Sequence, residues 1–284
     1  MKCPHMADCK KPTAHTICEM NVMPPDGPKG RKGIEGGAQR VLTAHEGYGV
    51  QLEGGYSAYN PLELPALHRY FQALGDDETK MLTFADKYGM LGEPVDVGAT
   101  GDRGVVEAVE PLRKWLDAVS ALSTAITVFD TQKSRPMCLS RWFSWKTEGD
   151  YTSVLFQTPT MRSQVADNTR HRTGLFNQLK RGDLQMPARV FVQDQINRAL
   201  RGLVLPMLLF DEKMELRLHD VPHSLYAAIW LQFAREVNGS VELGHCANDG
   251  CNEWWEIKGR GKSRKKFCTP RCKQADFERK KAQR

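Results

Sequence analysis

Four cysteines near the C-terminus occur as two closely spaced pairs. Cys246 and Cys251 form C-x4-C, and Cys268 and Cys272 form C-x3-C after a gap of sixteen residues. Each pair can span one edge of a tetrahedron, and a short polar spacer can bring the two pairs to one metal ion. We therefore predict that these four cysteines bind a structural Zn²⁺. Metal-binding thiolates must be reduced, so the pattern also favours a cytoplasmic location.

The segment that holds these cysteines also carries the chain's surplus positive charge. Residues 246–284 contain twelve basic and five acidic side chains, a net charge of +7, whereas the whole chain of 284 residues has +6. Residues 1–245 therefore sum to −1. A near-neutral body followed by a basic tail that a metal ion holds together indicates a nucleic-acid contact in the tail. We expect DNA as the partner.

The candidate nucleic-acid contacts fall into two groups. Residues 262–266 are expected to hold the phosphate backbone, and basic residues of a terminal helix are expected to face a groove. The candidates are Lys262, Arg264, Lys265, Lys266, Arg271, Lys273, Arg279 and Lys280. Trp254 or Trp255 could stack on a base, but packing of one tryptophan against the body is the interpretation we favour. The alternative function is a structural finger that serves protein–protein interaction without nucleic acid.

The rest of the chain predicts an α+β fold, with a mainly helical body and two β-hairpins ahead of the small finger. Residues 24–37 are rich in Gly and Pro, so we expect residues 1–40 to form a flexible arm. The body then covers residues 41–240 and the finger residues 241–284. The arm holds Cys3, His5, Cys9, His15 and Cys18, whose irregular spacing does not favour a second metal site.

Apolar residues at helical spacing predict the helices of the body. Asn60 and Pro61 are a good cap and first position for a single helix that ends at Leu74, and Ser224 can cap a strongly apolar helix. The predicted helices are 61–74, one that follows Asp76 and Asp77 and runs to Leu91, 111–129, one from about 187 to 200, and 225–237; the carboxylates of Asp76 and Asp77 favour a helix N-terminus. The last has so wide an apolar face that we expect burial on several sides, and the finger should pack close to it.

Period-two patterns predict the hairpins. One covers residues 141–157 and another residues 205–219, where the second strand alternates as a half-buried strand should. The Gly-rich residues 92–104 are expected to be a plain connection, and the basic residues 162–189 a solvated surface. In the finger, a knuckle at the first cysteine pair, a hairpin of 254–257 with 265–267, and a helix from Pro270 predict a treble-clef-like unit.

A longer pattern surrounds the four cysteines. It consists of Cys246-Ala-Asn-Asp-Gly-Cys-Asn-Glu-Trp-Trp, a basic stretch, Lys265-Lys-Phe-Cys, and Cys272 with a terminal basic helix. This pattern resembles the CGNR-type zinc finger, which in bacterial proteins follows the ABATE domain of stress-related transcription regulators. The resemblance implies that Cys246, Cys251, Cys268 and Cys272 are the zinc ligands and that the chain is a bacterial DNA-binding regulator. Lys273-Gln-Ala stands where the family has Gly-Asn-Arg, so no base-reading role is carried over.

Other functions have little support in the sequence. Four cysteine ligands leave no open position for a catalytic water, and the sequence lacks the Ser-His-Asp, H-E-x-x-H and phosphate-loop patterns, so we expect no enzyme. The most apolar run, from Leu225 to Leu231, is far shorter than the roughly 20 residues that span a bilayer. We therefore expect no membrane contact, and a body that either senses a ligand or forms a homodimer.

Overall fold

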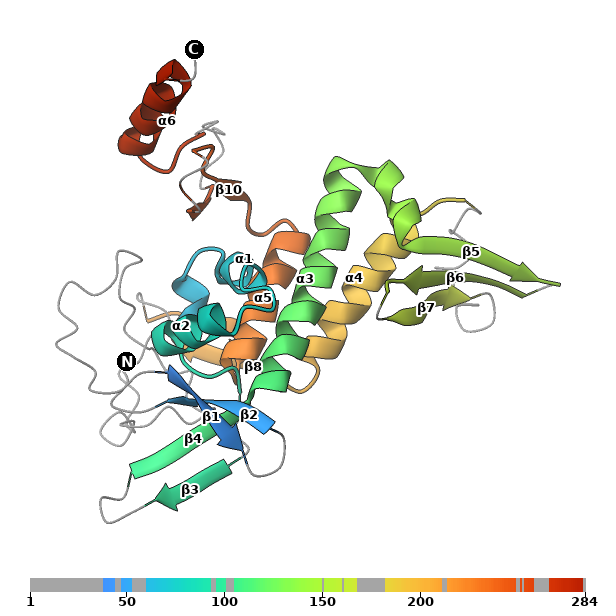
Figure 1. The fold of residues 1–284 in the computed structure, drawn as a ribbon. Helices are drawn as coiled ribbons and strands as arrows, with labels where there is room; N and C mark the ends of the chain where they lie inside the picture. Colours follow the sequence, from blue (N-terminus) through green and yellow to red (C-terminus); the bar gives the residue numbers. More distant parts are fainter. Residues whose placement is uncertain are drawn as a thin grey trace. The chain divides into compact units, whose positions relative to one another are not determined.

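The computed structural model describes residues 38–43, 47–52, 60–92, 96–100, 105–149, 151–159, 161–167, 182–210, 214–248, 251, 253–257 and 266–282. Helices and small antiparallel sheets alternate along these residues, which confirms the α+β class (Figure 1). The chain divides into two compact units, one formed by residues 1–118 with 202–284 and the other by residues 119–201. The predicted boundaries at residues 40 and 240 stay predictions.

The first unit contains a four-stranded antiparallel sheet in the order β1-β2-β4-β3. Its strands are β1 (Ala38–Thr43), β2 (Gly47–Leu52), β3 (Asp96–Thr100) and β4 (Val105–Pro111). The prediction of a plain connection over residues 92–104 was therefore wrong. Pairing with β4 holds residues 96–100 extended within this Gly-rich segment, because tertiary partners outweigh local preference in strands.

The predicted single helix over residues 61–74 is divided into two. A 3₁₀ turn, η1 (Pro61–Glu63), comes first, and α1 (Leu67–Gln72) follows. Pro65 explains the break, because it lacks an N–H and disfavours helical dihedrals in the residue before it. Leu64 is accordingly extended, with φ −78° and ψ 113°. The predicted cap is confirmed, since Asn60 Oδ1 accepts a 3.0 Å hydrogen bond from the Leu62 N–H.

Aromatic side chains from three helices form the core of the first unit. Phe71 of α1 packs edge to face on Phe84 of α2 (Glu78–Tyr88), with 5.3 Å between ring centroids. Trp115, near the start of α3 (Leu112–Ser134), is fully buried against both rings. Asp77 caps the N-terminus of α2, where its carboxylate was expected, by accepting a 3.2 Å hydrogen bond from the Lys80 N–H.

The last helix of the core, α5 (Leu225–Val237), contacts α1. Ser224 caps it as predicted, accepting a 3.1 Å hydrogen bond from the Ala227 N–H. Its residues are buried on several sides, which confirms the inference from its wide apolar face. It follows the predicted hairpin of β8 (Val204–Phe210) and β9 (Leu216–Pro222), and β9 contacts α5.

The second unit combines a three-stranded antiparallel meander with α4 and with the part of α3 from Val119 onward. Its elements are η2 (Pro136–Arg141), β5 (Phe143–Glu148), β6 (Tyr151–Gln157), β7 (Arg162–Asp167) and α4 (Gln185–Leu200). Phe156 stacks on Phe191 of α4 at 4.1 Å between centroids. The predicted hairpin at 141–157 is confirmed. The solvated surface predicted from residue 162 is wrong for β7, because Val165, Ala166 and Asp167 are buried.

None of the helices in the described part of the chain has the length and apolar character needed to cross a membrane.

Candidate metal centre

The four predicted cysteines converge on one point. Their Sγ atoms all lie within 4.8 Å of one another, with 3.6 Å between Cys251 and Cys268 and 3.3 Å between Cys268 and Cys272. Tetrahedral zinc with Zn–S bonds of about 2.3 Å separates its sulfur ligands by about 3.8 Å. The four thiols therefore fit a metal ion of this kind, and all are free cysteines.

A tight turn and a short hairpin position the first cysteine pair. Cys246 directly follows β10 (Leu243–His245), and its N–H donates to the Glu253 carbonyl at 3.0 Å. The Cys251 N–H donates to the Asn248 carbonyl at 2.8 Å, which closes the knuckle between the two thiols. Since the first pair sits on backbone bonded in this way, its two sulfurs face the same side of the turn.

The hairpin beside the knuckle pairs β10 with β11 (Trp254–Glu256), with Gly244 opposite Trp255. The indole of Trp255 covers the glycine, because a Cβ on Gly244 would lie 2.5 Å from Trp255 Cε2. We had expected β11 to pair with residues 265–267. Among the described residues it pairs with β10 instead, and Lys266 and Phe267 are not in a strand.

A helix N-terminus positions the second cysteine pair, as predicted. Thr269 accepts a 3.2 Å hydrogen bond from the Cys272 N–H through its hydroxyl, at the start of α6 (Pro270–Ala282). Cys268 precedes the helix and Cys272 lies in its first turn, so both sulfurs point to one side. The Ala247 N–H donates to the Lys266 carbonyl at 2.8 Å. This bond joins the backbone of the two cysteine pairs.

The crowded thiols influence one another before any metal binds. Burial, followed by hydrogen bonds among the thiols, raises the pKa of Cys268 to about 12. The hydrogen bond with Thr269, helped by the one with Cys268, lowers the pKa of Cys272 to about 7. Four thiolates this close repel one another, and a divalent cation at their centre removes that repulsion.

The segment between the cysteine pairs contacts α1. The Tyr70 hydroxyl donates to Glu253 Oε2 at 3.0 Å and accepts from the Trp254 N–H at 3.2 Å. The Arg69 guanidinium lies over the Trp254 ring at 5.2 Å from its centroid, and His245 packs on the same ring. Burial raises the pKa of Tyr70 to about 12. Trp254 therefore packs the finger against α1, in agreement with the interpretation we favoured.

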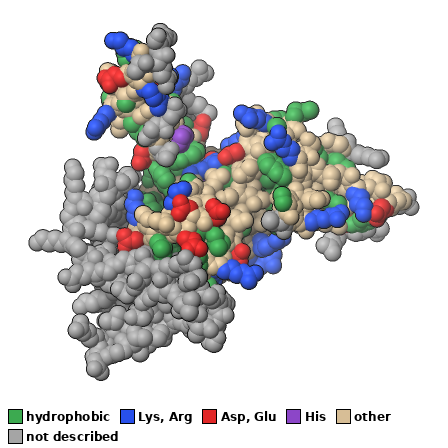
Figure 2. All heavy atoms as spheres, in the orientation of Figure 1, with side chains coloured by type: hydrophobic (Ala, Val, Ile, Leu, Met, Phe, Trp, Pro, Cys, Tyr) green, Lys and Arg blue, Asp and Glu red, His purple; other side chains and the backbone are tan. Residues whose placement is uncertain are grey.

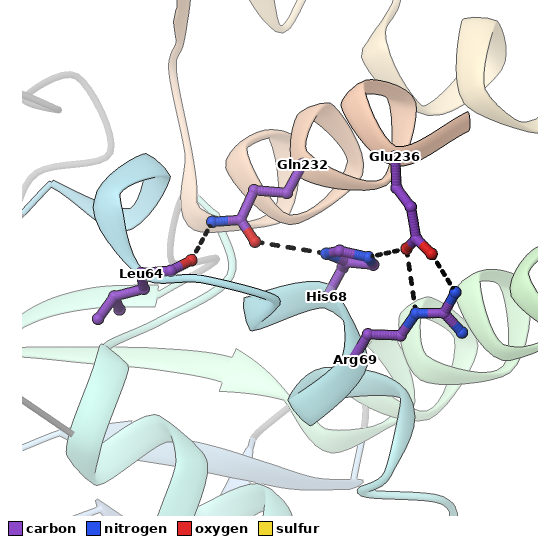
Figure 3. Close-up of polar contacts among 5 residues, drawn as sticks. All are labelled: Leu64, His68, Arg69, Gln232 and Glu236. Carbon is purple, nitrogen blue, oxygen red and sulfur yellow. Dashed lines mark hydrogen bonds and ion pairs between the residues drawn. The ribbon is translucent and has the colours of Figure 1, made fainter. Parts of the chain in front are cut away.

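His68 and Arg69, the residues before Tyr70 in α1, belong to a buried polar cluster that joins α1 to α5 (Figure 3). Glu236 accepts from Arg69 Nε at 3.1 Å and Nη2 at 2.5 Å, and its Oε2 lies 2.6 Å from His68 Nε2. Gln232 donates to the Leu64 carbonyl at 2.7 Å and lies 3.4 Å from His68 Nδ1. Burial on its own would raise the pKa of Glu236, but the hydrogen bonds from His68 and Arg69 lower it to about 2.

The predicted nucleic-acid residues differ in their surroundings. Arg279 and Lys280 each make a 2.7 Å ion pair with the buried carboxylate of Asp276, and the bond to Lys280 is the larger cause of the lowered pKa of Asp276. Lys266, Arg271 and Lys273 are exposed. Figure 2 shows basic and acidic side chains side by side on the C-terminal helix. Three candidates, Lys262, Arg264 and Lys265, lie outside the described residues, as do the N-terminal cysteines and histidines.

Comparison of the chain with protein-family models, with curated proteins and with solved structures gave no match. The likeness to the CGNR-type finger therefore stays a prediction, and the function has to be inferred from the site itself.

Proposed function

We propose that Cys246, Cys251, Cys268 and Cys272 bind one structural Zn²⁺ and that residues 243–282 form a zinc finger attached to α1. The convergence of the four Sγ atoms within 4.8 Å carries this proposal. Sulfur ligands of this number and spacing suit Zn²⁺, whereas Mg²⁺ and Ca²⁺ prefer oxygen. The ion would neutralise the thiolates and tie the knuckle after β10 to the start of α6.

The ligand set supports a structural role for the ion. Catalytic zinc sites keep one position for water or substrate, and four cysteines fill all four positions of a tetrahedral ion. The finger also buries little apolar surface of its own, since Cys246 is its one buried apolar side chain among the described residues. Metal binding would therefore contribute most of its folding free energy, on the order of 10 kcal/mol at neutral pH.

The finger is further proposed to contact nucleic acid through its basic side chains. The support is the net charge of +7 on residues 246–284, together with the exposure of Lys266, Arg271 and Lys273. The proposal follows the expectation of a DNA-binding regulator, and it concerns phosphate contacts rather than the reading of bases. If six to eight phosphates are contacted, log K should fall with log salt at a slope of about −5 to −7.

The alternative, a finger that binds another protein, is favoured by one observation. Asp276 pairs with both Arg279 and Lys280 and offsets one of their two positive charges, which lowers the charge that α6 can offer to phosphates. The two functions are separated by titrating fluorescent random-sequence duplex with the full chain, over a salt series, with and without a zinc chelator. Steep salt dependence that disappears with chelator supports nucleic-acid binding. Zinc-loaded protein that leaves the duplex unbound at low salt contradicts it.

A further inference from the structure

The β8–β9 hairpin exposes an unusual amount of apolar surface. Eight of the eleven exposed large apolar side chains in the described residues belong to it, so the exposure is a property of this hairpin. They are Leu205, Met207, Leu208, Leu209, Phe210, Met214, Leu216 and Leu218. Our expectation of a half-buried second strand was therefore wrong, because no described element covers Leu216 and Leu218, which are 58% and 69% exposed.

Four of these side chains form one face at the outer half of the hairpin. Leu208 lies opposite Leu218, and Phe210 lies opposite Leu216, in the antiparallel register. Directly opposed residues share a face, and so do residues two positions apart, so all four point to the same side. We call this set the hairpin face. It contains no charged group, and an apolar surface of this kind indicates an interaction site.

The base of the hairpin packs on the rest of the first unit, whereas no described element packs on the hairpin face. Pro222 is buried, β9 contacts α5, and the His223 N–H donates to the Leu203 carbonyl at 2.9 Å. A two-stranded sheet is only marginally stable in water without further packing. The outer half of β8 and β9 therefore lacks the apolar packing that would stabilise a two-stranded sheet.

We infer that the hairpin face binds the hairpin face of a second copy of this chain, around a two-fold axis. The four side chains expose on the order of 450 Å² per copy, and Met214 at the turn brings this to roughly 560 Å², taking about 190 Å² for a fully exposed side chain of this size. This is smaller than the roughly 800 Å² that a standard interface takes from each partner, so we expect a weak dimer whose population depends on concentration. The hairpin face would form its centre, with Met214 and the neighbouring side chains at its rim.

The chemical character of the hairpin face favours a second copy of this chain as its partner. A two-fold contact needs a surface that is complementary to itself, and an uncharged leucine and phenylalanine face meets this condition. Two twisted sheets can stack face to face at about 10 Å, with their side chains interdigitated. The inference depends on neither zinc nor nucleic acid, so it can fail or succeed separately from the proposed function.

The test is the mass of the full chain in solution, measured by sedimentation equilibrium over a range of micromolar concentrations. We expect the wild type to be a dimer and the double variant Leu208→Glu/Leu218→Glu to be a monomer with unchanged circular dichroism and zinc content. The matched control is Met137→Glu, at a residue that is 87% exposed in the second unit, and it should remain a dimer. A monomeric wild type, or a double variant that still dimerises, would overturn the inference.

A charge-exchange experiment tests the two-fold arrangement itself. Leu218→Glu and Leu218→Lys should each be monomeric alone, because like charges would meet across the axis. An equimolar mixture should form a heterodimer, because the two charges are then opposite. Failure of the mixture to associate contradicts the two-fold contact. Binding of a monomeric wild type to phosphatidylcholine vesicles would contradict it as well, since the hairpin face would then serve a lipid surface.

Discussion

Tyr70 of α1 donates a 3.0 Å hydrogen bond to Glu253, a residue 183 positions later in the chain, between the two cysteine pairs. The same hydroxyl accepts from the Trp254 N–H, and the neighbouring Arg69 lies over the Trp254 ring. Arg69 is in turn bound by Glu236 of α5. The candidate metal centre is thus connected to the buried cluster between α1 and α5 through adjacent residues of one helix.

Tyr70→Phe should loosen the finger without emptying the metal centre. The variant loses both hydrogen bonds of the hydroxyl, and the expected cost is about 1–3 kcal/mol of docking free energy. Hydrogen exchange of residues 243–257 should become faster while zinc content stays unchanged. Tyr151→Phe, in the second unit, is the control. Unaltered exchange in Tyr70→Phe would show that the hydroxyl does not hold the finger on α1.

Glu236→Gln should destabilise the body and remove part of its acid sensitivity. The pKa of Glu236 is about 2 in the folded chain, below its ordinary value of 4.5. A lowered folded pKa stabilises the fold above pH 4.5, and this contribution is lost as the pH falls toward 2. This contribution of the lowered pKa is on the order of 3 kcal/mol, and breaking the buried pair costs about 3–5 kcal/mol.

The measurement for this prediction is urea unfolding at several pH values between 2 and 7. The wild type should lose stability more steeply below pH 4.5 than Glu236→Gln does. Glu148→Gln is the matched control, because Glu148 forms an exposed ion pair with Lys146 and should change stability by under about 1 kcal/mol. Equal slopes for wild type and Glu236→Gln would argue against the assigned role of Glu236.

Gly244→Ala should disturb the hairpin beside the metal centre. The added Cβ would lie 2.5 Å from the Trp255 ring, so the indole has to move. Forcing an extra methyl into a packed contact costs about 1–3 kcal/mol. Tryptophan fluorescence should shift and zinc affinity should fall. Gly92→Ala is the control, because its nearest contact is an ordinary 3.6 Å to Glu110 Oε1. Wild-type fluorescence and affinity in Gly244→Ala would contradict the cross-strand packing.

Two pairs of basic residues on α6 should differ in their effect on nucleic-acid binding. Arg271→Ala/Lys273→Ala is expected to weaken duplex binding and to reduce the salt slope by about 2. Arg279→Ala/Lys280→Ala should change the affinity and the salt slope less, because both side chains are paired with Asp276, which offsets one of their two charges. Fluorescence anisotropy over a salt series measures the difference. Equal losses for the two pairs would show that Asp276 does not decide which residues meet phosphates.

The sequence was informative where a local rule determines the structure. The spacing of Cys246, Cys251, Cys268 and Cys272 predicted a convergence that the structure contains, since metal ligands must lie within a few ångströms of one ion. The helix caps could be predicted equally well, because Asn60 and Ser224 accept hydrogen bonds from N–H groups only two or three residues away. These features depend on neighbours in the chain and can be recognised without the fold.

Features that depend on distant partners could not be predicted in this way. His68 and Glu236 are 168 positions apart, and no spacing pattern links a histidine to a glutamate over that distance. The strand at residues 96–100 exists because β4 pairs with it, whereas the Gly-rich segment 92–104 that contains it favours a loop when read alone. The exposure of Leu216 and Leu218 was also hidden, since alternation shows which residues share a face but not whether another element covers it.

Zinc stoichiometry tests the central claim most directly. Inductively coupled plasma mass spectrometry should find one zinc per chain in the purified full-length wild type. It should find no zinc in the Cys268→Ser/Cys272→Ser variant. Cys138→Ser, which alters a free cysteine outside the cluster, should keep the wild-type value. Zinc-free wild-type protein that keeps a folded finger, or zinc content unchanged by the double cysteine variant, would contradict the assignment of these four cysteines as the metal ligands.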